Sequence, residues 1–340
     1  MNACLRALSN DGVEILLVAY ASNTSAPFSS ELLNWLPLEN KILLNEGCEL
    51  EGVHLSHIQK FCPNILICAG WSNYQYIKIA KKISDNCVKI ITFDTQYLLT
   101  FKQFLGKIWF RLSLLKIFNY AFVPGDRQLR AALYFGFKEK NIVMGSYAPD
   151  NIKEAPPDFK SISKNKKFIF VGRLVSEKGV KNLVEAYRLY RKASVSPWTL
   201  SVAGVGPLSS MLKVEGIDIL GFLPPDALFQ EMKNAGCLIA PSLFEPWGVQ
   251  ISEGASLGLP IIATTSCGAS VHLVRSNFNG HLIAPGDSVG LHRAMLSIAT
   301  FDDLEQFSKN SYSLSRQYTP TLWSKSILQI YFRFNNIGEL

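Results

Sequence analysis

The chain has 340 residues, which is enough for two domains that each bury a core of their own. Hydrophobic residues make up 48% and charged residues 18%. This excludes a disordered or low-complexity protein, because such chains lack the apolar surface that offsets the entropy of ordering. The formal net charge of +7 suits an anionic substrate, an acidic membrane face or a nucleic acid, and it does not choose among them.

Strand-like apolar runs alternate with helix-length amphipathic stretches in the first half of the chain. This alternation predicts parallel sheets built from βαβ units. The expected strands are Glu14–Tyr20, Asn64–Ala69, Val88–Phe93, Ala121–Val123 and Ile142–Met144. Residues 145–167 are then rich in Pro, Ser, Asn and Lys and are expected to form an interdomain linker.

The same pattern restarts after the linker. The expected strands here are Lys167–Val171, Leu200–Ala203, Ile217–Leu220, Cys237–Ala240, Pro260–Thr264 and Gly280–Ile283. We therefore predict an α/β protein with a first domain over 1–150, a second domain over 151–310 and a helical segment over 311–340 that returns towards the first. Both domains should be doubly wound and face each other across a cleft, with the ligand at the carboxyl ends of the strands.

Metal, disulfide and membrane-spanning signals are weak. The seven cysteines are scattered without a CxxC pair, which argues against a disulfide framework and a zinc site. His54 and His57 could share a helix face, but no third ligand type lies nearby in sequence. No run approaches the ~18 uncharged apolar residues that span a bilayer, and Met1–Asn10 lacks the layout of a signal peptide. We expect a cytoplasmic protein.

The segment from Phe168 to Tyr190 carries the first chemical signal. A buried strand ends in Gly172 and Arg173, a short loop carries Lys178, and a helix follows. Both cations should project from the carboxyl edge of a central strand, where Arg offers a planar fork and Lys a mobile point charge to a diphosphate. A solvated loop with two ordinary cations would give the same local pattern.

The segment from Pro241 to Thr264 carries the second signal. A loop with Glu245 and Gly248 should lead into a helix that begins near Val249 and includes Glu253. Glycine lets backbone amides approach a ligand, a helix amino terminus suits a phosphate, and a buried carboxylate suits paired sugar hydroxyls. Two surface glutamates on a helix are the plainer interpretation, but it does not explain Glu-Pro-Trp-Gly in an apolar segment.

Five motifs in order carry a family resemblance: VGRL with EKG, AGVGPL at Ala203–Leu208, LGFLP at Leu220–Pro224, PSLFEPWGVQISEG, and NGHLIAPGD at Asn279–Asp287. In this order they resemble the donor domain of the retaining nucleotide-sugar glycosyltransferases of family 4, of the bacterial group 1 type. The resemblance is close from Phe168 to about Met295 and weaker over Ala121–Phe137. It implies the GT-B fold, with two Rossmann-like doubly wound domains facing across a cleft.

The resemblance also implies roles for individual residues. Arg173 and Lys178 would neutralise the nucleotide diphosphate as its bond to the sugar breaks, and Glu253 would hold the ribose hydroxyls. Glu245 and the amides near Gly248 and Val249 would hold the transferred sugar and its phosphate. Gly204 to Gly206 and the Gly221–Phe222 turn would line the nucleotide pocket, and Gly172 would also belong to the donor-binding residues. The anomeric configuration would be retained through charge stabilisation and positioning, with neither a metal nor a cofactor.

The sequence departs from the family pattern in three places. The histidine that many members carry after a first-domain strand is absent, and Asp94 stands there, either in an orienting role or as a helix or turn cap. His272 follows the second-domain glycine loop where members often have an acidic residue. Cys4–Leu8 before Gly12 looks like a first helix entering a second strand, so we expect the first strand to be missing, through a start that lies upstream or an incomplete domain.

Residues 95–125 contain no acidic residue but carry Lys102, Lys107, Arg111 and Lys116 among large apolar side chains. An amphipathic element on a membrane surface is one interpretation, and a long core helix with snorkelling cations is the other. At ~100° per residue the four cations do not share one face.

The sequence thus predicts transfer of a hexose-type sugar from a nucleotide-sugar donor to a glycan or lipid-linked glycan acceptor, in cell-surface polysaccharide synthesis. We expect a cytoplasmic enzyme with peripheral contact to the inner membrane face and no nucleic-acid partner. Two alternatives stay open: a nucleotide-sugar epimerase or hydrolase on the same fold, and a catalytically impaired subunit that binds the nucleotide sugar.

Overall fold

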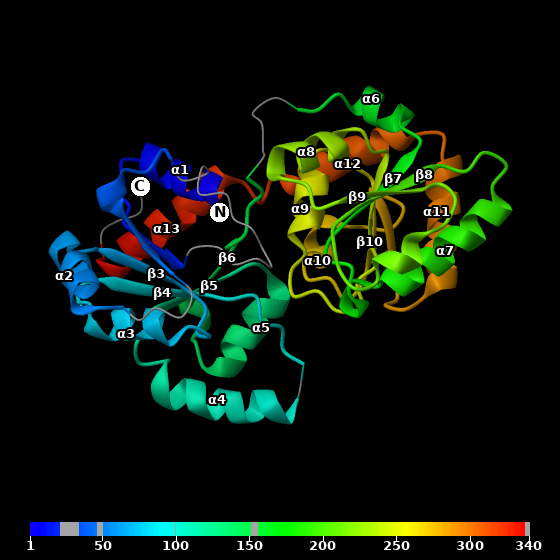
Figure 1. Ribbon diagram of the computed structural model, residues 1–340. Helices are drawn as coiled ribbons and strands as arrows, with labels where there is room; N and C mark the ends of the chain where they lie inside the picture. The colour runs from blue at the N-terminus through cyan, green and yellow to red at the C-terminus, as the bar shows by residue number, and fades with distance from the viewer. Residues whose placement is uncertain (21–33, 46–49, 99, 151–155, 337–340) are drawn as a thin grey trace. The chain divides into compact units, whose positions relative to one another are not determined.

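A computed structural model describes residues 1–340 apart from 21–33, 46–49, 99, 151–155 and 337–340 (Figure 1). The chain divides into two compact units, one made of Met1–Tyr147 with Pro320–Leu340 and the other of Ala148–Thr319. None of the helices in the described ranges is long and apolar enough to cross a membrane.

The described residues of the first unit form six strands in two parallel sheets. Strands β1 and β2 pair with each other, and the second sheet has the order β3-β4-β5-β6. The strands are β1 (Leu17–Tyr20), β2 (Lys41–Leu44), β3 (Ile65–Ala69), β4 (Val88–Thr92), β5 (Tyr120–Val123) and β6 (Ile142–Met144). Five lie where the sequence predicts them. Strand β2 was missed, because its formation depends on its pairing with β1 more than on its own sequence.

The helices found in the described part of this unit are α1 (Asn2–Asn10), α2 (Gly52–Phe61), α3 (Tyr74–Lys82), α4 (Phe101–Ser113), α5 (Asp126–Phe135) and α13 (Pro320–Phe334). Helices α1 and α13 pack together, and the Ser324 hydroxyl donates to the Asp11 carboxylate at 2.6 Å. The last helix of the sequence is therefore part of the first unit.

A cavity of about 360 Å³ lies in the first unit between β1 and β3. Consecutive residues line it from both strands, Leu16–Ala19 on one side and Ile65–Ala69 on the other, and Met1 and Trp323 also border it. Neighbouring residues of a strand point to opposite faces of a sheet, so consecutive lining residues mean that the strand edges border the cavity. Each of the two strands pairs on one side only.

The second unit is one six-stranded parallel sheet in the order β12-β11-β10-β7-β8-β9. Its strands are β7 (Lys167–Val171), β8 (Thr199–Ala203), β9 (Ile217–Gly221), β10 (Cys237–Ala240), β11 (Ile261–Thr264) and β12 (Gly280–Ile283). Strands β10 and β11 are buried along their whole length, which explains their uninterrupted apolar runs. All six lie where the sequence predicts them.

Helices cover both faces of this sheet, with α7 and α11 on one side and α9 and α12 on the other (Figure 1). The helices are α6 (Phe159–Lys164), α7 (Val180–Ala193), α8 (Pro225–Lys233), α9 (Val249–Ser256), α10 (Ser270–Leu273), α11 (Ser288–Thr300) and α12 (Leu304–Ser315). The linker prediction was wrong for α6, which packs on α12 through Phe159 and Tyr312, with ring centres 5.7 Å apart. Ile162 is also buried, and two apolar anchors suffice to hold this short helix.

Candidate functional site

Two of the sequence-predicted residues, Lys178 and Glu245, meet where the strand order of the second unit reverses. The chain runs from β7 outward through β8 and β9, then returns to the other side of β7 as β10. The loops after β7 and β10 therefore leave adjacent strands in opposite directions. In open α/β sheets, this switch point at the carboxyl ends of the strands is where ligands bind.

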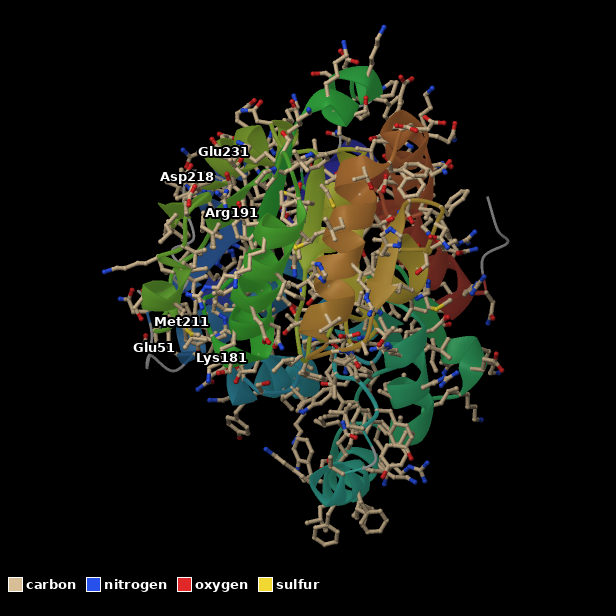
Figure 2. The ribbon with its side chains drawn as sticks, turned by 90° about the vertical axis from the view of Figure 1, so that its right-hand side faces the viewer. Glu51, Lys181, Arg191, Met211, Asp218 and Glu231 are labelled. Atoms are coloured by element: carbon tan, nitrogen blue, oxygen red, sulfur yellow. The ribbon has the colours of Figure 1, made fainter. Side chains whose placement is uncertain are left out.

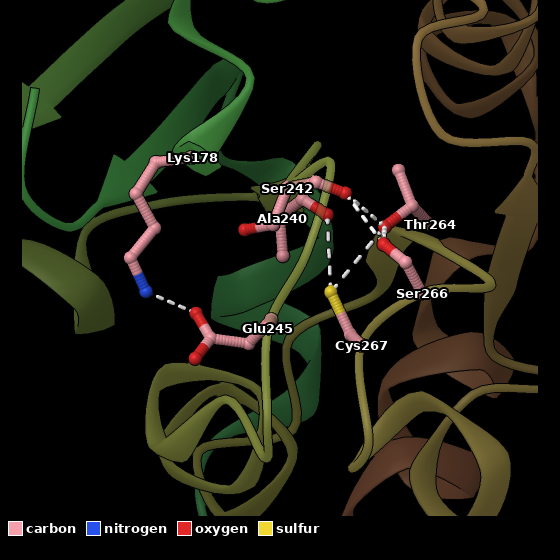
Figure 3. A network of polar contacts seen from close by, with 7 residues as sticks. All are labelled: Lys178, Ala240, Ser242, Glu245, Thr264, Ser266 and Cys267. Carbon is pink, nitrogen blue, oxygen red and sulfur yellow. Dashed lines mark hydrogen bonds and ion pairs between the residues drawn. The ribbon is translucent and has the colours of Figure 1, made fainter. Parts of the chain in front are cut away.

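The loop after β7 brings Lys178 to the loop after β10, where its ammonium pairs with the Glu245 carboxylate (Figure 3). The side chains of Lys178 and Glu245 are only 16% and 10% exposed, so the pair is largely withdrawn from water. The sequence places the two residues in separate roles. The structure shows that they act on each other directly.

Backbone contacts fix this approach of the two loops. The Leu243 amide donates to the Glu177 carbonyl at 2.8 Å. A Cβ at Gly179 would lie 2.0 Å from the Pro241 carbonyl oxygen, so only glycine allows the loops to come this close. Lys178 is thereby held over the end of β10.

The loop that carries Glu245 is also tied to the loop after β11. The Gly268 amide donates to the Glu245 carbonyl at 3.1 Å, and the hydroxyls of Thr264 and Ser266 both donate to the Ser242 carbonyl, at 2.6 and 2.7 Å (Figure 3). These three hydrogen bonds satisfy buried polar groups and fix the backbone of the loop that carries Glu245. Sequence reasoning missed it, because Ser and Thr after a strand carry no distinctive signal.

Trp247 holds the same loop in place by burying its side chain against an aromatic cluster. It is 1% exposed and packs edge-on against Tyr318, with ring centres 5.4 Å apart, and beside His272 at 5.9 Å. A buried tryptophan explains why an apolar segment contains Glu-Pro-Trp-Gly. His272, the departure from the family pattern, lies in this aromatic cluster.

Glycines form the turns after β7 and β8. A Cβ at Gly204 would lie 1.9 Å from the Gly172 carbonyl oxygen, and the Gly204 amide donates to the Gly221 carbonyl at 2.7 Å. The three backbones therefore meet without side chains between them. A Cβ at Gly206 would lie 2.6 Å from the Leu174 carbonyl oxygen in the loop after β7. Phe222, directly after β9, is exposed.

Arg173 and Glu253 complete the set in the second unit. Arg173 is exposed directly beyond β7, and no hydrogen bond or ion pair of its guanidinium is formed with the residues that the structure describes. Glu253 lies on α9, which begins at Val249 with Gly248 as its N-cap. Burial raises the pKa of the Glu253 carboxyl to about 7, and the Asp150 carboxylate contributes to this rise.

Asp94 lies in the other unit, after β4, and the Gln128 side chain donates to its carbonyl at 3.0 Å. It does not cap the following helix, because Thr100 accepts from the Gln103 amide at the start of α4. Asp94 therefore belongs to the first unit, whereas the other predicted site residues belong to the second. Within the described ranges no three His, Cys, Asp or Glu side chains gather as a metal ion would need.

The sequence of this unit matches a known family. Residues 151–313 fit the family model described as Glycosyl transferases group 1. The second unit, Ala148–Thr319, is similar to this family over nearly its whole length. Its switch-point residues are those that the sequence analysis assigned to the donor.

Two curated relatives show how far the similarity extends. The uncharacterized glycosyltransferase MJ1607 of Methanocaldococcus jannaschii is 27% identical over 129 residues, which cover 35% of this chain and 32% of that protein. The poly(glycerol-phosphate) alpha-glucosyltransferase of Bacillus subtilis is 22% identical over 298 residues, covering 84% of this chain and 43% of that protein. The chain spans less than half the length of either relative.

Solved structures match over nearly the whole chain. The crystal structure of Anabaena Alr3699/HepE in complex with UDP and glucose aligns with a TM-score of 0.70 at 16% identity, covering 96% of this chain and 94% of that one. This likeness confirms the predicted fold, GT-B, with two Rossmann-like α/β domains.

Proposed function

We propose that the chain is a glycosyltransferase that moves a hexose-type sugar from a nucleotide-sugar donor to a glycan or lipid-linked glycan acceptor, with retention of the anomeric configuration. The single observation that carries the proposal is the Lys178–Glu245 pair at the switch point of the second unit. Arg173 follows the end of β7 by two residues. The group 1 family match over the same residues supports it.

The charges at this site suit a nucleoside diphosphate. Glu245 balances the Lys178 ammonium in the unliganded chain, so the partly buried lysine carries no uncompensated charge. A diphosphate at the switch point would give Lys178 a second anionic partner and would meet the guanidinium of Arg173, which can bind two phosphate oxygens at once. Glu245 would then be available to the sugar hydroxyls.

The Glu253 carboxyl suits the ribose. Its raised pKa reflects burial more than any neighbouring charge. Two vicinal hydroxyls that donate to the carboxylate would stabilise its charged form and return the pKa towards its usual range. Glu253 would therefore select for a ribonucleotide.

The chemistry that we propose needs positioning more than a strong base. The bond from the anomeric carbon to the diphosphate oxygen breaks, and the acceptor oxygen forms the new bond on the same face. The acceptor proton passes to the departing phosphate oxygen. Arg173 and Lys178 would stabilise the charge that develops on the diphosphate, with no metal and no cofactor in the proposal.

We further propose that the acceptor belongs to cell-surface polysaccharide synthesis and that the enzyme works in the cytoplasm, at the inner membrane face. The Bacillus subtilis relative, whose name describes transfer to poly(glycerol-phosphate), supports a polymeric acceptor. Asp94 is proposed to orient the acceptor or the sugar from the first unit.

The experiment that tests donor binding is a thermal-shift panel of the purified chain with UDP, GDP, ADP and their sugar conjugates, without metal. A ligand at 100 times its dissociation constant adds about 2.7 kcal/mol to stability. Stabilisation by one nucleotide family, lost in Arg173→Ala, is expected. If no nucleotide stabilises a folded sample, the donor site is not formed.

Turnover separates the proposal from its alternatives. A transferase consumes the donor only when an acceptor glycan is present, whereas a hydrolase or epimerase needs none. An impaired binding subunit would show the thermal shift and no turnover with any acceptor. Donor consumption measured with and without a panel of polysaccharide acceptors distinguishes these outcomes.

A further inference from the structure

Helix α4 turns a band of large apolar side chains to solvent. Phe101 is 75% exposed and Leu112 is 72% exposed, at opposite ends of the helix. The rest of the band is about half exposed and consists of Phe104, Leu105, Ile108 and Trp109. Figure 2 shows the side chains of α4 standing out from the ribbon at the lower end of the view. Single exposed apolar residues are normal on a protein surface, but a continuous band of six indicates an interaction site.

The band is the solvent-facing side of an amphipathic helix. At ~100° per residue the six positions fall within an arc of about 140°, and Phe110, the buried residue of α4, lies opposite its centre. The structure therefore does not support a long core helix, because α4 buries one residue and exposes its apolar face.

Cations border this band on both sides. On the same helical wheel of about 100° per residue, Lys102 lies on one flank of the band, and Lys107 and Arg111 lie on the other. Lys107 sits 4.3 Å above the Tyr134 ring, and the Arg111 guanidinium donates to the Tyr134 carbonyl at 3.5 Å. The sequence analysis noted that the cations do not share a face. Because the apolar band lies between these cations, both of its edges carry positive charge.

The charge of this region has one sign. No Asp or Glu occurs between Asp94 and Asp126, while the same stretch holds three cations of α4 and the exposed Lys116 beyond its end. A helix with exposed aromatic and aliphatic side chains on one face and cations on both flanks is typical of helices that lie in the interface of an anionic bilayer.

We infer that α4 docks the protein on an anionic lipid bilayer, with the band from Phe101 to Leu112 inserted between the headgroups and the flanking cations on the lipid phosphates. This inference names the element by which the enzyme meets its membrane. It does not depend on sugar transfer, because lipid binding is measured without donor or acceptor.

The test is sedimentation of the full chain with phosphatidylcholine vesicles, with and without phosphatidylglycerol. The wild-type chain binds the anionic vesicles, and the double variant Phe101→Ser, Leu112→Ser binds roughly a hundredfold more weakly. Each inserted side chain contributes about 1.5 kcal/mol, so the two together contribute about 3 kcal/mol. The matched control is Leu38→Ser, Val195→Ser, which removes two exposed apolar residues elsewhere and leaves binding unchanged.

A second pair of variants tests the charge. Lys102→Gln and Lys116→Gln should each weaken binding to anionic vesicles about fivefold, since one cation near an anionic surface is worth about 1 kcal/mol. Neither should change binding to phosphatidylcholine alone. All α4 variants should keep the thermal shift given by nucleotide, so a failure of docking is distinguishable from a failure of the donor site.

Three results would overturn the inference: no binding of the wild-type chain to anionic vesicles, equal losses in the α4 and control variants, or a dimer in solution that Phe101→Ser, Leu112→Ser converts to a monomer without any effect on vesicle binding. The last result would assign the band to a second copy of the chain.

Discussion

Replacing Glu253 by Gln should stabilise the protein while it weakens nucleotide binding. Burial raises the pKa of Glu253 from 4.5 to about 7, so the folded chain holds this proton more tightly than the unfolded chain does. Between pH 4.5 and pH 7 the native state binds more protons, and stability falls as the pH rises. Ionised Glu253 is therefore a cost to folding above pH 7.

The size of the effect follows from the pKa values of the folded and unfolded chains. A tenfold change in an acid dissociation constant corresponds to about 1.36 kcal/mol, so the ionised carboxyl destabilises the fold by about 3 kcal/mol at pH 8 and by less than about 1 kcal/mol at pH 5. Glu253→Gln removes the charge and keeps the shape. It should recover most of this difference at pH 8 and little of it at pH 5.

Thermal unfolding at the two pH values measures this change. For a domain of this size, 1 kcal/mol changes the melting temperature by about 2–4 °C, so Glu253→Gln should raise it by roughly 6–12 °C at pH 8. Asp218→Asn is the matched control, because Asp218 is an exposed acid of β9 in the same unit (Figure 2). A gain that is the same at both pH values, or that Asp218→Asn also gives, would refute the reasoning.

The same variant tests the ribose assignment. Nucleotide affinity should fall about tenfold from pH 8 to pH 6 in the wild type as Glu253 takes up its proton, beyond any dependence from the phosphates. Calorimetric titration of Glu253→Gln should show weaker binding without that component. If the full pH dependence persists in Glu253→Gln, Glu253 does not bind the ribose.

Three further predictions concern the switch point and the first unit. Lys178→Ala leaves the Glu245 carboxylate without its cation and should lower the free energy of unfolding, measured with denaturant, by about 2–4 kcal/mol. Adding Glu245→Gln should restore much of this stability. If stability does not recover in the double variant, the two residues are not a coupled pair. Gly204→Ala puts a Cβ 1.9 Å from a backbone oxygen, so it should lower the free energy of unfolding by about 2–5 kcal/mol and abolish the nucleotide thermal shift. The control Gly52→Ala places its Cβ in open space and should be tolerated. Equal melting temperatures of the two variants would refute this prediction. An extended apolar segment joined ahead of Met1 should fill the cavity between β1 and β3 and raise the melting temperature above that of a Gly-Ser extension of equal length; no difference would show that the cavity does not accept a strand.

The sequence by itself determined the strands of the second unit and the local form of its site. Strands such as β7 and β10 are buried by layers on both sides, so their apolar runs are visible without knowledge of neighbours. The loop from Glu245 to Gly248 and the start of α9 at Val249 also follow from residues close in sequence.

Tertiary structure alone decided which of these groups meet. Lys178 and Glu245 are 67 residues apart, and their pairing depends on β10 returning beside β7, which no local pattern encodes. The raised pKa of Glu253 likewise comes from what surrounds α9. The four-residue β2 was missed because its formation depends on pairing with β1 more than on its own sequence.

Helix α4 shows most clearly which properties follow from the sequence and which depend on tertiary structure. Composition alone shows that residues 95–125 carry cations and no acids. A helical wheel gives the same angles whether the apolar band faces a core or a membrane. Only the packing of Phe110 into the first unit decides that the opposite face, from Phe101 to Leu112, remains in solvent.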